Sequence, residues 1–241
     1  MRTAAVLLSA CFLTAAAAHA SIIVGTPNFG DCYPFTCNDS GTNTGQSIEY
    51  QQVYDATTFS SGINISAITL FDAYSAKHFG GKLAVLSGNY DISFSITPAS
   101  AGGLSNTLAN NVGSGGLTTF FDGHLGGPIK LNMFTIPGSV FSYNPKLGNL
   151  LIDIRVTNQT IFPNGTGNSY VDADNTGLFT SRAYQLGNST TGAVDSAGLV
   201  SEFTGTTFTV SPEPGTMLLL SGGLLALVAI RKRSRAALLP K

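Results

Sequence analysis

Short segments in which apolar and polar residues alternate dominate the middle of this chain. In DISFSIT, at residues 91–97, Ile92, Phe94 and Ile96 alternate with two serines. NLLIDIRVT, at residues 149–157, alternates in the same way after its first residues. Successive side chains of a strand point to opposite faces, so each segment predicts one buried face and one solvated face. The pattern predicts an antiparallel β-sandwich.

Other segments have the composition of strands, rich in Val, Ile, Thr, Phe and Tyr and bounded by Gly, Asn, Ser and Pro. We expect turns at Asp122-Gly123, Pro137-Gly138 and Asn164-Gly165, and one helical turn within 105–111. Regularly spaced strands without a repeat period indicate a single sandwich or jelly-roll domain over residues 21–210. The expected strands lie at residues 50–54, 63–71, 82–86, 92–97, 118–121, 130–135, 150–157, 179–185 and 199–210.

The first twenty residues have the three parts of a secretory signal peptide. Arg2 supplies the positive start, residues 4–17 the apolar middle, and Ala18-His19-Ala20 the cleavage site with small residues at both ends. We expect signal peptidase to cleave after Ala20, so that the mature chain begins at Ser21. The alternative is a lipoprotein signal ending at Cys11, but the apolar stretch before Cys11 is shorter than signal peptides require.

Charge is distributed unevenly along the chain. The whole sequence has a net charge of −1, but residues 21–211 hold six basic and twelve acidic residues, which leaves this part at −6. A nucleic-acid partner needs clustered Lys and Arg, so this balance disfavours one. The low charge content of 10% and the apolar content of 43% are typical of a chain that can form a core.

Two cysteines remain after removal of the signal peptide, Cys32 and Cys37 in GDCYPFTCNDS. An even count in an exported chain favours a disulfide. The loop that this disulfide would close is small, so it fixes one turn rather than stabilising the whole domain. Metal binding is the alternative, but two thiolates are too few for a structural zinc site.

The stretch VSPEPGTMLLLSGGLLALVAIRKRSR, at residues 210–235, joins three parts in order. Pro212-Glu213-Pro214 comes first, and its prolines keep the chain extended. The apolar residues 215–230 follow; as a helix they span about 24 Å, less than the roughly 30 Å of a bilayer core. A basic cluster comes last and favours a cytoplasmic C-terminus. Its members are Arg231, Lys232, Arg233 and Arg235.

This order resembles the C-terminal sorting signal of PEP-CTERM proteins, over residues 211–235. The resemblance implies an exported bacterial protein that is processed by exosortase, a protease-like membrane enzyme. It also implies attachment to the inner membrane through the helix at 215–230 during transit, then release to the cell envelope or the exterior. The body of this chain is similar to bodies of this class, which are β-sandwiches of unassigned function. The similar segments are GDCYPFTC, EYQQVYDATTFSSGINISAITLF and NPKLGNLLIDIRV. A permanent stop-transfer anchor is the alternative for the tail.

One acidic cluster could hold a cation. Asp172, Asp174 and Asn175 in YVDADNTG place alternate oxygens near a Gly turn, as a hard cation such as Ca²⁺ requires. Counted from Asp172, the twelfth residue is Ala183, where an EF-hand loop has Glu. A turn held by Asp and Asn side chains is therefore the favoured alternative.

No catalytic motif appears in the sequence. Ser87 and Ser114 lack the G-x-S-x-G context of a nucleophilic serine. The histidines His78 and His124 are both expected in solvated loops. The two glutamates of the body could serve a glycosidase only as a pair, and nothing in the sequence relates them. They are Glu49 and Glu202.

We therefore expect a non-enzymatic surface or matrix protein with no cofactor. The resemblance alone implies an association with exopolysaccharide or biofilm. A carbohydrate-binding module is the first alternative, because sandwiches often present Tyr and Phe to sugars, although this chain has no Trp. A secreted hydrolase is the second alternative.

Overall fold

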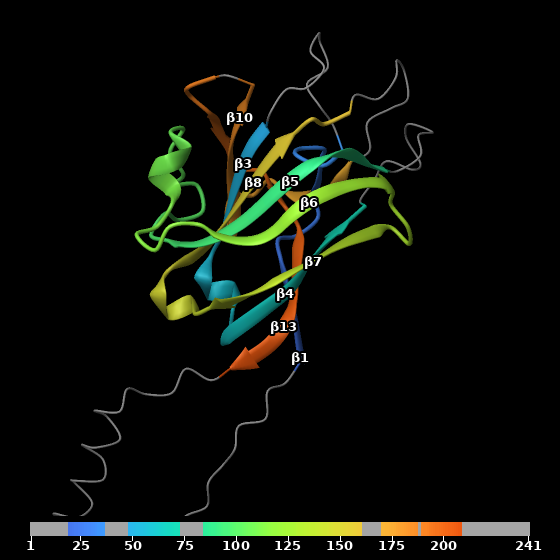
Figure 1. Cartoon of the computed structure of the whole chain (residues 1–241). Coiled ribbons are helices and arrows are strands. Elements are labelled where there is room, and N and C mark those ends of the chain that lie inside the picture. The colour runs from blue at the N-terminus through green and yellow to red at the C-terminus, as the bar shows by residue number, and fades with distance from the viewer. Residues whose placement is uncertain (1–18, 37–47, 73–83, 161–169, 188, 209–241) are drawn as a thin grey trace, which may run out of the picture. The chain divides into compact units, whose positions relative to one another are not determined.

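Two antiparallel β-sheets pack face to face in the computed structural model (Figure 1), which describes residues 19–36, 48–72, 84–160, 170–187 and 189–208. The four-stranded sheet has the order β1 (His19–Val24), β13 (Ser201–Phe208), β4 (Gly62–Phe71) and β7 (Met133–Tyr143). The six-stranded sheet has the order β11 (Ala193–Asp195), β10 (Thr180–Leu186), β3 (Ile48–Tyr54), β8 (Asn149–Thr157), β5 (Ala84–Thr97) and β6 (Thr118–Pro128). A small third sheet joins β12 (Gly198–Leu199), β9 (Val171–Asp174) and β2 (Phe29–Asp31).

The strand order is that of a jelly roll. The eight strands β1, β3 to β8 and β13 can be numbered one to eight along the chain. One sheet then contains strands one, eight, three and six, and the other contains strands two, seven, four and five. Apart from β5 and β6, which pair within one sheet, the chain-adjacent strands of this set cross between the two sheets, as in the double Greek key of a jelly roll. The antiparallel all-β prediction is confirmed. Helical structure within the described residues consists of short 3-10 segments: η1 (Ala56–Thr58), η3 (Leu108–Asn111) and η4 (Pro145–Leu147).

The core lies between the two large sheets and is built around aromatic rings. Phe203 of β13 has its ring centroid 4.8 Å from that of Tyr54 on β3 and 6.3 Å from that of Phe94 on β5. Phe94 in turn packs against Phe141 of β7 at 5.1 Å. These contacts join strands of both sheets, and burying such rings is the main source of stability in a sandwich.

The prediction of a solvated outer face is wrong for much of β5 and β8. Ser93, Ser95 and Asp153 point away from the main core, yet each is 5% exposed or less. Residues 98–117, which include η3, lie over this face. They add a second hydrophobic cluster whose members are Val53, Leu104, Leu108, Leu151 and Ala183. Arg155, on the same face, stays exposed as expected.

Several strand boundaries also differ from the sequence prediction. The two segments expected at 82–86 and 92–97 belong to one strand, β5, which contains irregular pairing with β6 between Val85 and Gly88. The strand expected at 130–135 begins only at Met133, because Leu131 and Asn132 have φ angles of 56° and 60° and form a turn before β7. The turn expected within 105–111 is confirmed as η3. Strands β1, β2, β9 and β11 were not anticipated.

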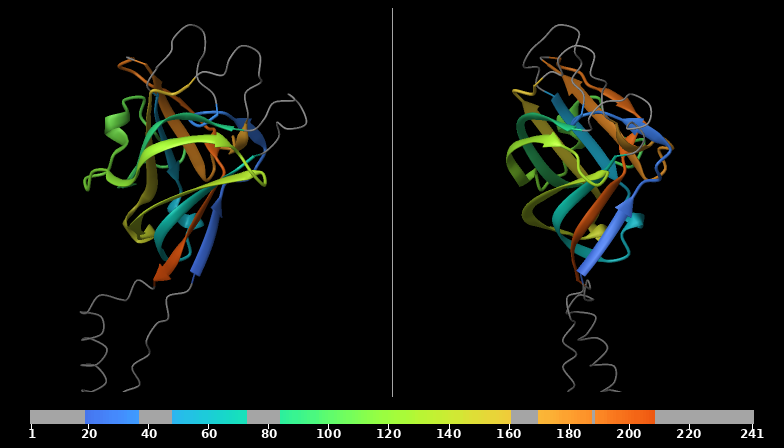
Figure 2. Two further views of the ribbon diagram at one scale, coloured as in Figure 1. Left: turned by 45° about the vertical axis from the view of Figure 1, so that its right-hand side comes forward. Right: turned by 90° about the vertical axis from the view of Figure 1, so that its right-hand side faces the viewer.

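The first and last strands of the body are neighbours. β1 pairs with β13 in antiparallel register, so His19 lies opposite Thr206 and Ala20 opposite Gly205. Figure 2 shows the blue β1 and the orange β13 side by side in both views. The beginning of β1 and the end of β13 therefore lie at the same end of the sandwich. Residues 1–18, which make up most of the predicted signal peptide, lie outside the described residues, so the signal peptide stays a prediction.

Candidate functional site

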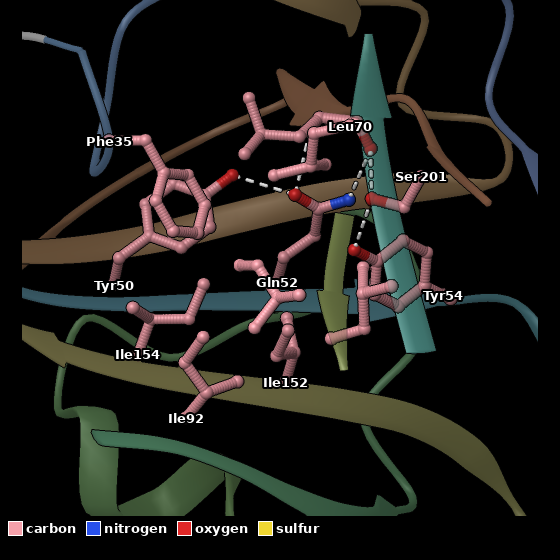
Figure 3. A pocket seen from close by; sticks show the side chains of 12 residues that line it. Phe35, Tyr50, Gln52, Tyr54, Leu70, Ile92, Ile152, Ile154 and Ser201 are labelled. Atoms are coloured by element: carbon pink, nitrogen blue, oxygen red, sulfur yellow. Dashed lines mark hydrogen bonds between the residues drawn. The ribbon is translucent and has the colours of Figure 1, made fainter. Parts of the chain in front are cut away.

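The interior of the sandwich is tightly packed around its buried polar groups. One internal space among the described residues measures about 10 Å³, close to the minimum for one water molecule. Figure 3 shows the Gln52 amide crossing this space towards β12 and β13. Tyr50 Oη donates a hydrogen bond to Gln52 Oε1 at 2.7 Å, and Tyr54 Oη lies 2.8 Å from Ser201 Oγ. These buried polar groups hold strands together rather than bind a ligand.

A buried arginine joins three strands beside the cysteine segment. Arg182 of β10 is 8% exposed; its Nε lies 2.9 Å from Asp195 Oδ1 and its Nη2 3.0 Å from Asp195 Oδ2. Arg182 Nη1 also pairs with Asp31 of β2. Burial raises the pKa of Asp31, and Arg182 and the backbone N–H of Tyr33 partly offset this effect. The guanidinium stacks over Tyr184 at 5.0 Å. All its charge is satisfied internally, which indicates a structural role.

This ion cluster anchors the start of GDCYPFTC. The Asp31 carboxylate accepts the backbone N–H of Cys32 at 2.8 Å, and Tyr33 stacks on Tyr184 at 5.5 Å. Phe35 then enters the main core, 5.6 Å from Tyr90. The segment thus closes one end of the sandwich. Cys37 lies outside the described residues, so the disulfide with Cys32 stays a prediction.

The acidic candidate site forms a turn. Asp174 Oδ1 accepts the backbone N–H of Thr176 at 2.8 Å, and Asp174 Oδ2 accepts that of Thr26 at 2.9 Å. Burial raises the pKa of Asp174, but these hydrogen bonds outweigh it and the net pKa is lowered. The Asn175 N–H binds Asn28. This is the turn alternative that the sequence favoured.

Asp172 does not complete a metal site with these residues. Burial, and then the neighbouring carboxylate of Asp72, raise the pKa of Asp172. Among the described residues, no three His, Cys, Asp or Glu side chains are grouped so that they could hold a metal ion. Calcium binding at Asp172, Asp174 and Asn175 stays a prediction for titration to test.

The structure brings Ser87 and His124 together, although they lie far apart in the sequence. Ser87 Oγ lies 2.9 Å from His124 Nε2, and His124 Nδ1 lies 3.5 Å from Asn89 Oδ1. The β5–β6 register produces this row, because it places His124 opposite Asn89. Gly126 leaves room for it, since a Cβ there would lie 2.7 Å from Ser87 Cα. Sequence reading missed the row because the irregular pairing beside Ser87 has no sequence signature.

The remaining catalytic candidates are not brought together. Glu49 pairs with Arg155 at 3.2 Å on the outer face of the six-stranded sheet, and Glu202 pairs with Ser21 on the four-stranded sheet. The two carboxylates therefore lie on opposite sides of the sandwich, which argues against a glycosidase pair. His78 lies outside the described residues.

The described residues form a surface groove of about 590 Å³. It lies where the end of β5, the loop after η3 and the end of β7 meet. Ser114 lines this groove, together with Thr118, Phe141 and Leu147. Its volume lies within the usual range of ligand sites.

Residues 209–241 are a second unit of the chain. Residues 212–234 match the family described as the PEP-CTERM protein-sorting motif. The chain carries a PEP-CTERM sorting signal. This match contains Pro212, Glu213 and Pro214 and the basic residues Arg231, Lys232 and Arg233. No curated protein and no solved structure matches the chain.

The PEP-CTERM signal itself lies outside the described residues, as does the apolar segment at 215–230. Within the part of the chain that is described, no helix has the length and apolar character needed to cross a membrane. The signal implies an exported protein with a C-terminal membrane attachment before processing.

Proposed function

We propose that this chain is a non-enzymatic surface or matrix protein, which is exported through an N-terminal signal peptide and released from the inner membrane by exosortase. The PEP-CTERM motif at residues 212–234 carries this proposal. The apolar segment is short for a lasting anchor, and Gly222-Gly223 weakens it further, which fits a segment that is held briefly and then removed.

The geometry of the body supports attachment through both tails. His19 lies opposite Thr206, so the signal peptide and the sorting signal connect to the same end of the sandwich. Such neighbouring attachment points suit a body that is held at a single membrane. Cleavage after Ala20 would leave β1 with four paired residues, Ser21 to Val24, opposite Thr204 to Ser201.

Processing is tested by expressing the chain with an epitope after Lys241 in cells with and without exosortase. We expect the epitope to be lost from the envelope form only when exosortase is present. Replacing Pro212 and Pro214 by Ala should preserve the epitope. In the matched control, Pro137 and Pro145 are replaced by Ala, and the epitope should be lost as it is in the parent chain. Intact protein as the sole envelope form in exosortase-positive cells would instead establish the permanent anchor.

A secreted hydrolase is the second candidate, favoured by the contact between Ser87 and His124. In an acyl transfer, His124 Nε2 would accept the Ser87 proton while Ser87 Oγ attacks an ester carbonyl, and Asn89 would orient the ring. The ester C–O bond would then break, His124 would give the proton to the leaving alkoxide, and water would hydrolyse the acyl-serine. Labelling of the full-length chain with a fluorophosphonate tests this candidate. Labelling that is lost in Ser87→Ala and in His124→Ala, but kept in Ser114→Ala, would support hydrolysis over the non-enzymatic role.

A further inference from the structure

The groove between the ends of β5 and β7 has the chemistry of a ligand site. We propose that it binds a neutral oligosaccharide, through hydroxyl and backbone groups on one wall and apolar side chains on the other. The inference deepens the matrix role and rests on it, because a matrix protein requires a partner in its surroundings. The partner that it names is an uncharged molecule rich in hydroxyl groups.

Part of the groove wall is fixed before any ligand arrives. The N–H of Gly113 donates to Ser95 Oγ at 3.1 Å, and Thr97 Oγ1 donates to the Asn111 carbonyl at 2.6 Å. Gly113 lies so close to β5 that a Cβ there would be 1.7 Å from the Ile96 oxygen. The loop after η3 is thus held against β5, and a preformed wall lowers the entropy cost of binding.

The groove has no ionisable side chain in its lining. A charged ligand would lose water there without gaining a counter-charge, which is unfavourable. The surrounding body is acidic, with six basic and twelve acidic residues between 21 and 211, and would also repel a polyanion. These two observations exclude acidic polysaccharides and favour an uncharged ligand.

The two kinds of surface in the groove match the two faces of a sugar ring. Within the described part of the chain, the hydroxyls of Ser114 and Thr118 make no internal hydrogen bond and remain available. Hydroxyls both donate and accept, as sugar hydroxyls do. Leu147 is 68% exposed and Phe141 is partly exposed, so both offer apolar surface to the C–H face of a ring.

Gly115 provides a direct way to close the groove. An added Cβ at Gly115 meets no atom within 4 Å, so a larger side chain fits without displacing the fold. Because Gly115 lines the groove, we expect the indole of Gly115→Trp to occupy part of its mouth and to leave stability unchanged. Val194→Trp is the matched control, because Val194 is 49% exposed on β11, which does not line the groove.

The experiment uses the full-length chain in detergent and labelled hexasaccharides: neutral glucans, mannans and galactans, and the acidic polygalacturonate. We expect at least one neutral hexasaccharide to bind and polygalacturonate not to bind. Gly115→Trp should abolish binding, Thr118→Val should weaken it about tenfold, and Val194→Trp should bind as the parent does.

Three outcomes would overturn the inference: no binding of any neutral hexasaccharide, equal binding of polygalacturonate, or unchanged binding by Gly115→Trp. Binding of an uncharged peptide in competition with the sugar would also overturn it. The exosortase assay, run on the same variants, separates this inference from the proposed function. Gly115→Trp should still lose its C-terminal epitope, so a failed sugar site leaves the sorting result intact.

Discussion

The side chain of Gln52 pairs with both backbone groups of Leu199. Gln52 Oε1 accepts the Leu199 N–H at 2.7 Å, and Gln52 Nε2 donates to the Leu199 carbonyl at 2.8 Å. Gln52 lies on β3 and Leu199 on β12, so an amide side chain takes the place of a neighbouring strand. All these groups are buried. The pair connects the six-stranded sheet with the chain that leads into β13.

Replacing Gln52 by Leu should destabilise the body strongly. The change keeps a side chain of similar size but removes the acceptor shared by the Leu199 N–H and the Tyr50 hydroxyl, both in the core, whereas the Leu199 carbonyl keeps the hydrogen bond from Ser201 Oγ at 3.1 Å. Each unpaired buried group costs about 1–3 kcal/mol, so we expect a loss of about 2–5 kcal/mol in the free energy of unfolding. Guanidinium denaturation of the full-length chain measures it. Gln185→Leu, on the partly exposed part of β10, should change it by less than about 0.5 kcal/mol.

The buried ion cluster gives a second prediction. Arg182→Met leaves the carboxylate of Asp31 buried without its partner, which should cost about 3–5 kcal/mol in the free energy of unfolding. The double variant Arg182→Met with Asp31→Asn should recover part of this loss, because the uncompensated charge is removed.

The matched control for Arg182 is Arg155→Met. Arg155 pairs with Glu49 at 3.2 Å, but its side chain is 51% exposed. Arg155 also pairs with the buried Asp153 at 3.3 Å, but Gln51 still donates a hydrogen bond to that carboxylate in the variant. Because solvent screens the half-exposed guanidinium, Arg155→Met should lose less than about 2 kcal/mol in the free energy of unfolding. Equal losses for the two arginine variants would show that burial does not decide the strength of these pairs.

The free energy of unfolding should depend on pH through the titration of Asp153. Burial raises the pKa of Asp153 to about 6, above its ordinary 3.8, although hydrogen bonding from Gln51 and the charge of Arg155 oppose the shift. A raised pKa means that the folded state favours the protonated carboxyl. The stability that Asp153 contributes is therefore fully present below about pH 4 and is lost as the pH rises through about 6.

Asp153→Asn removes this titration but keeps an acceptor for the Gln51 amide. We expect the free energy of unfolding to fall less between pH 4 and pH 7 in this variant than in the parent chain. Asp122→Asn, at an exposed position on β6, should follow the parent curve. Superimposable pH profiles for the parent and Asp153→Asn would contradict the assignment.

The sequence predicted the inner faces of the sheets better than the outer ones. The alternation at Ile92 and Phe94 identified the side that enters the core, because strand geometry alone decides it. Ser95, which points outward from the core, is buried for a reason that the alternation of apolar and polar residues does not reveal. Its hydroxyl accepts a hydrogen bond from Gly113, eighteen residues further along the chain. A small polar residue suits both solvent and a polar cover, so composition does not distinguish the two.

Turn signals misled the sequence prediction in edge strands. Pro137-Gly138 lies inside β7 and Asp122-Gly123 inside β6, and each of these strands is the last of its sheet. An edge strand has a neighbour on one side only, so a proline there need not break the ladder of hydrogen bonds. The same signals in a central strand would have ended it.

The candidate sites depend on long-range pairing that local patterns do not reveal. Arg182 meets Asp31 from 151 residues away, and Ser87 meets His124 from 37 residues away. The sorting signal, in contrast, was predicted from local sequence, because its three parts are consecutive, and the match to the PEP-CTERM motif over residues 212–234 confirms it. The sequence therefore identifies the sorting signal of this protein, and the structure is needed to place its candidate sites.

Two glycines of the groove wall provide the last prediction, because they are close in sequence and opposite in their surroundings. A Cβ on Gly113 would lie 1.7 Å from the Ile96 oxygen and 2.9 Å from its carbon, whereas a Cβ on Gly115 meets nothing within 4 Å. Gly113→Ala must push the loop away from β5, which should cost about 1–3 kcal/mol. For a domain of this size, that is a fall of about 2–4 °C in Tm per kcal/mol. Gly115→Ala should melt with the parent chain. Equal melting of both variants would show that the loop after η3 does not rest on β5, and it would remove the preformed wall on which the sugar site depends.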